Sequence, residues 1–447
     1  MNKILFVSAS PTHFSSLLPL AVFLKNDFKI SFFFDERYHR ISKELDECEV
    51  HDFEFQRFND KTYPKSKLIT FIEKVLWRIG FGKSWLAKVL NSFNKFKSEL
   101  RYCRRFIKDQ KVELIVSAEN NTRTGLLFDK TAKQNKIKSI VTVFTLANSE
   151  ELGYVYSRKQ EYIISSFKKK LFFGVFNSWA IIYKGIPTAC ELTENILAKA
   201  LLGLNPVNPW LSVGGNSTRI VFDSEFVKDY YCFSGLKSQK NIDLLPSVNF
   251  LNFRKINQEK DFHIKSINNS FGLYNDKPVL LCSIPPDIIK NSHFETFDQL
   301  VNFFCSVLSE DGFYNVWLSL HPRFPIDKIS ILSNYNVYIV NKPIELLIPL
   351  CDVFVAATSA TIRYALTCKK QVLNFDIFDA NYSEYKTINS VITVTNTSDF
   401  EKEYNAIKDG IYSISTQEYY KSKNNYFGDI DNLNEDFIKS YYKKLCQ

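Results

Sequence analysis

The chain has 447 residues, which is more than one hydrophobic core usually organises, so we expect two domains. Hydrophobic residues make up 45% and charged residues 23%, proportions that exclude a disordered chain. The formal net charge of +9 is moderate, no apolar run approaches the roughly 18 residues of a membrane-spanning helix, and no nucleic-acid-binding motif accompanies the basic residues. We therefore expect a folded protein that neither crosses a membrane nor binds nucleic acid.

In the first half of the chain, short apolar runs typical of buried strands alternate with stretches of helical periodicity. The expected strands cover 3–8, 28–34, 48–54, 112–117, 139–144 and 218–222, and the expected helices cover 14–26, 66–110, 123–135 and 224–231. Residues 150–215 are less regular. Strands separated by helices predict a parallel sheet with helices on both faces.

The second half repeats this alternation after a polar stretch. The expected strands cover 278–283, 314–320, 336–340, 352–356, 371–375 and 390–394, and the expected helices cover 294–309, 343–349, 359–367 and 397–407. The sequence thus predicts an α/β protein with two doubly wound, Rossmann-like parallel sheets that face a cleft. We place the domains at 1–240 and 276–414, a linker region at 241–275, and a helical tail at 415–447 that crosses back to the first domain.

The cysteines and the N-terminus indicate a cytoplasmic protein. Nine cysteines are scattered without a close pair, so they suggest neither a metal knuckle nor a redox motif. The first apolar run, 3–8, is followed at once by polar residues and is too short for a secretory signal. No acidic pair has a recognisable metal-binding spacing, so we expect no metal and no cofactor.

The first strand of the chain leads into Ser10-Pro11-Thr12-His13, which places His13 at the sheet's carboxyl edge. A histidine can accept a proton from a hydroxyl group near neutral pH. Glu119 follows the strand 112–117 and is an equal candidate for the catalytic base, with Asp35 or Glu36 behind both. Helix capping by Thr12 or Ser15 is the simpler explanation of the first loop.

The segment 168–176 combines Lys168, Lys169 and Lys170 with Leu171 and a run of aromatic residues. Basic residues next to aromatic residues suit an anionic membrane surface, so we expect peripheral contact with the inner face of the cytoplasmic membrane. A solvated helix face over a core is an equally good interpretation.

In the second domain, His321, Pro322 and Arg323 follow the strand 314–320. A histidine at a strand's carboxyl end can donate a ring N–H to a phosphate oxygen, the proline fixes the turn, and the arginine adds a charge-assisted bond.

Thr358, Ser359 and Thr361 lie where the strand 352–356 gives way to a helix. The first backbone N–H groups of a helix attract anions, and the three hydroxyl groups would extend that cradle. One helix cap explains one such residue. Three of them beside a His–Pro dipeptide predict a site for a nucleotide phosphate.

At this point the chain resembles the GT-B glycosyltransferases of bacterial surface polysaccharide assembly (capsule and lipopolysaccharide), especially their sialyltransferase-like, Kdo-transferase-like and CDP-glycerol transferase-like branches. The resemblance rests on His321-Pro322, on Thr358-Ser359 with Thr361, and on the helix and strand at 364–373. It implies that His321, Ser359 and, less directly, Thr358 and Thr361 contact the donor phosphate.

Two positions depart from the family pattern. Tyr364 stands where many UDP-sugar enzymes carry a ribose-binding glutamate, which favours a CMP- or CDP-linked donor. Glu310-Asp311-Gly312 matches a sialyltransferase motif in letters but lies in the expected donor domain, so we predict a helix-terminal turn there.

The resemblance implies an inverting, metal-independent transferase that moves a sugar, such as a sialic acid or Kdo, from a nucleotide to a surface glycan or lipid-linked acceptor. A UDP-sugar-dependent hexosyltransferase and a nucleotide-sugar 2-epimerase are the alternatives among enzymes. A noncatalytic adaptor that binds a membrane or a glycan is the alternative from another class.

Overall fold

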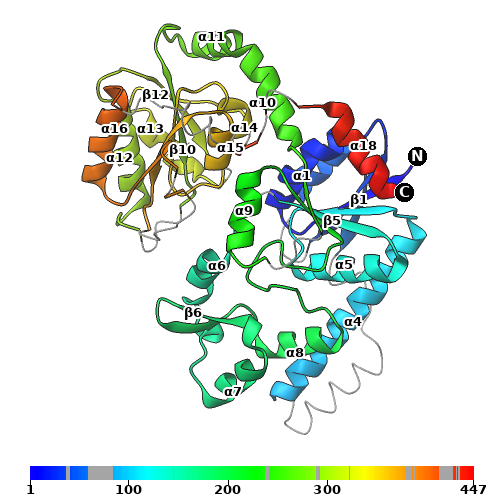
Figure 1. Ribbon diagram of the computed structural model, residues 1–447. Coiled ribbons are helices and arrows are strands. Elements are labelled where there is room, and N and C mark those ends of the chain that lie inside the picture. The colour runs from blue at the N-terminus through cyan, green and yellow to red at the C-terminus, as the bar shows by residue number, and fades with distance from the viewer. Residues whose placement is uncertain are drawn as a thin grey trace. The chain divides into compact units, whose positions relative to one another are not determined.

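The computed structural model describes residues 1–36, 41–58, 84–143, 145–236, 241–287, 292–321, 323–378, 385–386, 388–411, 426–428, 430 and 433–447. The chain divides into two compact units (Figure 1). Unit 1 comprises Met1–Asp223, Val227–Leu245 and Asn434–Gln447, and unit 2 comprises Ser224–Phe226 and Pro246–Leu433.

Unit 1 contains a seven-stranded parallel sheet with the order β3-β2-β1-β4-β5-β8-β9 among the described residues. The strands are β1 (Lys3–Ser8), β2 (Lys29–Asp35), β3 (Glu54–Phe58), β4 (Leu114–Ser117), β5 (Lys138–Thr142), β8 (Arg219–Phe222) and β9 (Ile242–Leu244). Every residue of β1 is buried, as expected of a parallel strand covered on both faces. The strand order reverses direction between β1 and β4, which makes this pair the topological switch point of the sheet.

Helices cover both faces of this sheet. They are α1 (Pro11–Leu24), α2 (Ser42–Val50), α4 (Trp85–Asp109), α5 (Arg123–Asn135), α9 (Glu225–Phe233) and α18 (Glu435–Cys446). On one face, α4 and α5 pack on Leu5 and Phe33. On the other face, Phe14 of α1 contacts Phe32 and Phe34, with ring centroids 5.0 and 5.5 Å apart.

A small insertion lies between β5 and β8, where the sequence suggests only irregular structure. It contains α6 (Ser149–Tyr156), η2 (Gln160–Tyr162), α7 (Phe167–Val175), η3 (Asn177–Trp179), the hairpin of β6 (Ala180–Tyr183) and β7 (Ile186–Ala189), and α8 (Thr193–Leu201). Its own core is built around Phe173, Trp179 and Trp210. These elements are too short for a clear periodic signal.

Unit 2 contains a six-stranded parallel sheet with the order β12-β11-β10-β13-β14-β15 in the described part of the chain. The strands are β10 (Val279–Ile284), β11 (Asn315–Leu320), β12 (Val337–Ile339), β13 (Val353–Ala356), β14 (Gln371–Phe375) and β15 (Val391–Val394). The order again reverses beside its first strand, between β10 and β13.

The helical elements of unit 2 also lie on both faces of its sheet. They are α10 (Val248–Gln258), α11 (Lys260–Phe271), α12 (Phe297–Ser309), η4 (Ile326–Lys328), α13 (Ile329–Leu332), α14 (Ile344–Leu347), α15 (Ile362–Thr367) and α16 (Thr397–Lys408). The core on one face joins α12 and α16 to alternate residues of β10, β11 and β14. On the opposite face, the buried indole of Trp317 donates a hydrogen bond to Asn268 of α11 (3.2 Å).

Several predicted elements need correction. The strand predicted at 48–54 is wrong for most of its length, because α2 continues to Val50 and β3 begins only at Glu54. The buried residues Glu44 and Cys48 are spaced four apart, which is a helical repeat. Of the predicted helix at 66–110, residues 66–83 lie outside the described residues, and α4 accounts for the rest.

The region 241–275, predicted as a linker region, contains β9, α10 and α11. At the C-terminus, α18 belongs to unit 1. Its Lys443 and Lys439 pair with Asp27 at 2.7 and 3.5 Å, and the hydrogen bond from Lys443 lowers the pKa of Asp27. In Figure 1 this helix lies beside α1. Residues 415–425, 429, 431 and 432 of the predicted tail lie outside the described residues.

Candidate functional site

The carboxyl ends of β1 and β4 bring two segments of unit 1 together at the switch point. Val7 of β1 pairs with Ser117 of β4, so the residues that follow both strands emerge side by side. After β1, the Ser10 hydroxyl caps α1 by accepting the N–H of His13 (3.2 Å), and Pro11 occupies the first turn. After β4, the chain continues through Glu119 to the Thr122 cap of α5. Ligands of doubly wound sheets bind at such a point.

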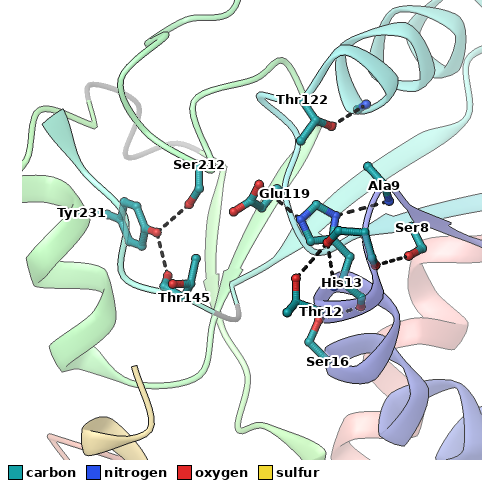
Figure 2. Close-up of polar contacts among 12 residues, drawn as sticks. Ser8, Ala9, Thr12, His13, Ser16, Glu119, Thr122, Thr145, Ser212 and Tyr231 are labelled. Atoms are coloured by element: carbon teal, nitrogen blue, oxygen red, sulfur yellow. Dashed lines mark hydrogen bonds and ion pairs between the residues drawn. The ribbon is translucent and has the colours of Figure 1, made fainter. Parts of the chain in front are cut away.

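His13 and Glu119, the two candidate bases, contact each other here. Nε2 of His13 lies 3.3 Å from a carboxylate oxygen of Glu119, as Figure 2 shows. The N–H of Ala9 donates to Nδ1 of His13 (3.4 Å). Since Nδ1 accepts this bond, the proton of the neutral imidazole is assigned to Nε2, from which it is donated to Glu119.

The two side chains differ in access. That of His13 is 7% exposed and that of Glu119 is 22% exposed. Both nitrogens of His13 face a partner, whereas the carboxylate is the half of the pair that solvent reaches. The geometry therefore suits Glu119 as the proton acceptor and His13 as the residue that orients it.

The loop 212–217 is clamped to the segment after β4. Backbone N–H groups of Asn120 and Asn121 donate to the carbonyl oxygen of Ser212, both at 3.2 Å. The side chain of Asn120 accepts the N–H of Gly215 (2.9 Å) and donates to the hydroxyl of Ser217 (2.6 Å). The side chain of the fully buried Asn120 thus fixes the backbone segment that carries Glu119.

Two glycines allow this close approach. A Cβ atom at Gly215 would lie 2.4 Å from the carbonyl oxygen of Asn120, and one at Gly125 would lie 2.7 Å from its Cα. Both distances are shorter than real contacts of a Cβ atom. A glycine at each position therefore lets two backbone segments meet on Asn120. The sequence favours a simple turn at 212–217, with close backbone approach to a ligand as the alternative, and the structure shows close approach to Asn120.

Asp129 of α5 lies beneath the same loop. Its side chain is buried, and it accepts the N–H of Asn216 (2.9 Å). Burial raises the pKa of Asp129 to about 7, although hydrogen bonds from Asn216, Ser139 and Asn120 oppose the rise. The group under the loop therefore titrates near neutral pH.

Tyr231 of α9 supports the loop from another direction. Its hydroxyl donates to the carbonyl oxygen of Thr145 (2.8 Å) and shares a hydrogen bond with Ser212 (2.7 Å), as Figure 2 shows. It also accepts the N–H of Ala147 (3.2 Å). Burial raises the pKa of Tyr231, and the negative charge of Glu119 adds to the rise. The phenol therefore stays protonated, and its hydroxyl holds the loop at Ser212 by hydrogen bonds.

The weaker base candidates have structural partners. Asp35 is buried at the end of β2 and accepts a hydrogen bond from the hydroxyl of Thr124. Glu36 pairs with Arg57 at 2.6 Å. Neither forms part of the His13 and Glu119 pair.

In unit 2, the predicted phosphate-binding residues lie at the carboxyl edge of the sheet. Leu320 of β11 pairs with Ile284, and Ala356 of β13 pairs with Ser283. His321 and Thr358 therefore follow strands on either side of β10, about 10 Å apart from strand to strand. This edge includes the switch point of the second sheet.

His321 is held as a hydrogen-bond donor. Its backbone N–H continues the β10 pairing by donating to Ile284 (3.1 Å), and its Nδ1 accepts the N–H of Arg323 (3.0 Å). Burial lowers the pKa of His321, and the charge of Arg323 lowers it further. The neutral ring then carries its proton on Nε2. Arg323 itself is exposed, and Pro322 lies outside the described residues.

Thr358 has an unusual backbone for a β-branched residue, with φ at +51°. Its N–H donates to the side chain of Asn374 (2.9 Å), and within the described structure its buried hydroxyl oxygen has no hydrogen-bond partner. Strained residues of this kind concentrate at ligand sites.

Ser359 and Thr361 form a local turn. Their hydroxyl groups lie 2.8 Å apart, and the N–H of Thr361 donates to the Ser359 hydroxyl (3.3 Å). The N–H of Ile362 donates to the Ser359 carbonyl oxygen (3.2 Å), and α15 has only six residues. The N–H groups of Thr361 and Ile362 are therefore used within the turn, and phosphate binding by Ser359 and Thr361 stays a prediction.

Tyr364 and Gly312 both have structural roles in unit 2. The hydroxyl of Tyr364 accepts from Arg363 (3.1 Å) and its ring packs on Phe253 at 5.4 Å, so Tyr364 has a packing role. Gly312 has φ at +62° after α12, and Asp311 pairs with Lys408. The prediction of a helix-terminal turn there is confirmed.

Within the described ranges, no three His, Cys, Asp or Glu side chains gather as a set that could hold a metal ion. In the same part of the chain, no helix combines the length and apolar character needed to cross a membrane.

Sequence reasoning missed Asp129 and Tyr231, and it placed Asn120 at the sheet edge without identifying it as a support of the loop. Their partners lie far away in the sequence: Asn120 bonds Gly215, Asp129 bonds Asn216 and Tyr231 bonds Thr145. The Gly214-Gly215 pair and a carboxylate inside the helix 123–135 were visible in the sequence. Neither feature indicates which distant residue it contacts.

No protein-family model and no curated protein sequence matches the chain. Solved structures with a similar fold include the UDP-GlcNAc 2-epimerase from Neisseria meningitidis bound to UDP-GlcNAc, with a TM-score of 0.52, 12% identity and 99% of each chain covered. A glycosyltransferase from Rickettsia africae ESF-5 gives a TM-score of 0.50 at 13% identity, covering 100% of this chain and 97% of that one.

A variant of the wall teichoic acid polymerase TagF with CDPG gives a TM-score of 0.50 at 11% identity, covering 100% of this chain and 88% of that one. At these identities the likeness shows a shared fold. The predicted GT-B-like pair of doubly wound parallel sheets is thereby confirmed.

Proposed function

We propose that the protein is a metal-independent, inverting glycosyltransferase that uses a nucleotide-activated sugar. The observation that carries this proposal is the pair of His13 and Glu119 at the switch point of unit 1, 3.3 Å apart. A partly exposed carboxylate oriented by an imidazole N–H is suited to accept a proton from an acceptor hydroxyl. The acceptor we propose is a surface glycan or a lipid-linked glycan.

The reaction is a single displacement. The acceptor oxygen forms a bond to the anomeric carbon of the sugar while the bond from that carbon to the donor phosphate breaks, and its electron pair stays on the phosphate. The hydroxyl proton passes to Glu119, and His13 keeps the carboxylate in place. Attack opposite the leaving group inverts the anomeric centre.

Unit 2 would bind the donor phosphate. A neutral His321 can donate its Nε2–H to a phosphate oxygen, and the hydroxyl groups of Thr358, Ser359 and Thr361 can add further bonds as negative charge develops. Arg323 can contribute a charge-assisted bond. A nucleotide-linked ligand is supported by the UDP-GlcNAc and the CDPG named for two structures of similar fold.

A CMP-linked sugar, such as a sialic acid or Kdo, is the proposed donor. The support is the resemblance at His321, Ser359 and Thr361, together with Tyr364 in place of the ribose-binding glutamate of UDP-sugar enzymes. A tyrosine offers no carboxylate to a ribose, and the ring of Tyr364 packs on Phe253.

Calorimetric titration with CMP, CDP, UDP and GDP tests the donor. Selective binding of cytidine nucleotides, lost in His321→Ala, supports the proposal, and UDP preference would redirect the search to hexosyl donors. Incubation with UDP-GlcNAc without an acceptor then separates the two enzyme classes, since an epimerised free nucleotide sugar would identify a 2-epimerase. No nucleotide binding at all would favour the noncatalytic adaptor.

A further inference from the structure

Helix α7 in the insertion of unit 1 presents apolar side chains to solvent. Phe167, Leu171 and Val175 are 80%, 67% and 76% exposed. They recur every fourth residue, so they lie along one face of the helix. We call these three residues the apolar stripe.

The helix is nonetheless anchored. Phe173 is buried and packs with Trp179 in the core of the insertion, and Phe172 and Phe176 pack against the same core. Helix α7 therefore has one apolar face in the core and a second one on the surface. Contiguous exposed apolar surface, especially where polar residues surround it, marks protein or membrane interaction sites.

The three lysines of α7 differ in their surroundings. Nζ of Lys169 donates to the backbone carbonyl oxygens of Glu161 (2.7 Å) and Ile163 (2.9 Å), so this side chain is tied to the insertion itself. Lys168 and Lys170 are exposed. At about 100° per residue, they lie on either side of the apolar stripe. Helix α7 contains no acidic residue.

Two more exposed apolar residues lie at the start of α4, which packs against α7. The indole of Trp85 contacts the ring of Phe172, with centroids 6.3 Å apart. Trp85 and its neighbour Leu86 are themselves exposed. Tryptophan is enriched at the level of lipid head groups, where its ring has an apolar body and a polar edge.

We propose that the apolar stripe, together with Lys168 and Lys170, docks the protein onto an anionic lipid bilayer. The apolar side chains enter the boundary between head groups and acyl chains, and the two lysines extend to lipid phosphates beside them. Charge decides between a bilayer and a protein partner, because a helix flanked by lysines and free of acidic residues matches a negative surface. This inference does not depend on the proposed activity.

Vesicle sedimentation of the full chain tests the inference. Mixed phosphatidylcholine and phosphatidylglycerol vesicles should bind the protein, pure phosphatidylcholine vesicles should bind it much more weakly, and added salt should release it. The Phe167→Ser/Leu171→Ser variant should bind on the order of 100-fold more weakly. The Lys168→Gln/Lys170→Gln variant should lose roughly 30-fold on the mixed vesicles.

A matched control is Lys25→Gln/Lys43→Gln, which removes the same charge from two exposed positions on other elements of unit 1. It should bind like the wild type. Equal losses in the two lysine pairs, wild-type binding by the Phe167→Ser/Leu171→Ser variant, or no binding of the wild type at low salt would each overturn the inference. So would an oligomer in light scattering that the serine variant dissociates while vesicles remain unbound. Circular dichroism establishes that each variant is folded.

Discussion

The imidazole of His13 and the carboxylate of Glu119 lie 3.3 Å apart, although 105 residues separate them in the sequence. Each follows one of the two strands between which the order of the first sheet reverses. The fold therefore unites two residues that, in the sequence, are competing candidates for one role, and their different exposure assigns them different parts.

We predict that Glu119→Gln lowers kcat about 10²- to 10⁴-fold, because the amide cannot accept the acceptor proton. The dissociation constant of the donor nucleotide, measured by calorimetry, should not change. A comparable loss of donor binding would instead place Glu119 in donor recognition.

For His13 we predict a graded effect that depends on the N–H donor. His13→Gln should retain more activity than His13→Leu, since only glutamine can donate to Glu119. The KM for the acceptor should stay close to that of the wild type in both variants, because His13 acts on Glu119 and not on the substrate. Equal kcat values for the two variants would indicate a purely structural role.

His321→Ala should weaken nucleotide binding about 10- to 100-fold. This loss corresponds to the free energy that a hydrogen bond to a charged group usually contributes. Because burial and Arg323 lower the pKa of His321, the ring is already neutral at pH 7. Nucleotide affinity should therefore stay level between about pH 7 and 8.5. A site that needs a protonated histidine would lose affinity over the same range. The control is His263→Ala on α11 of the same unit, which should bind normally.

Thr358→Gly should raise the stability of unit 2 by roughly 1 kcal/mol, since glycine adopts the positive φ of +51° without strain. The same change should weaken nucleotide binding because it removes a hydroxyl group from the proposed site. Lys369→Gly is matched, with φ at +57°, and should gain similar stability while nucleotide affinity is unaffected. Undiminished affinity in Thr358→Gly would remove Thr358 from the site.

The raised pKa of Asp129, about 7, makes the stability of unit 1 dependent on pH. The folded state holds a proton that the unfolded chain releases near pH 4, so stability should fall as pH rises from about 4 to 7 and then level off. Asp129→Asn keeps an oxygen for the Asn216 N–H and removes this titration. Chemical denaturation at pH 5 and at pH 8 should show that the stability of the variant relative to the wild type increases with pH, by a few kcal/mol in order of magnitude.

Gly215→Ala should destabilise unit 1 by about 1–3 kcal/mol, because the added methyl group meets the carbonyl oxygen of Asn120 at 2.4 Å. Gly174→Ala in α7 is the control. No atom lies within 4 Å of its added Cβ, and alanine favours the helix by about 0.5–1 kcal/mol. Thermal unfolding of both variants measures the contrast, and equal transitions would show that the loop yields at Asn120.

Much of the fold could be predicted from the chain alone. Apolar runs such as 3–8 and 278–283 alternate with helical periods, and this alternation specifies two parallel sheets. The prediction failed at 48–54, where a short amphipathic helix and a strand adjoin. It also missed the insertion with α7, whose elements are too short to establish a period.

The sequence by itself determined which residues end strands, and so it placed His13, Glu119, His321 and Thr358 at sheet edges. Only the tertiary structure decided which of them meet, because strand order depends on packing between distant segments. It also decided that Lys169 is tied to the backbone while Lys168 and Lys170 are exposed, and that Asn120 and Asp129 hold the loop at Gly215. Helical spacing indicates on which face of a helix a side chain lies. Whether that side chain is buried and which groups it bonds depend on the second segment that packs against the helix.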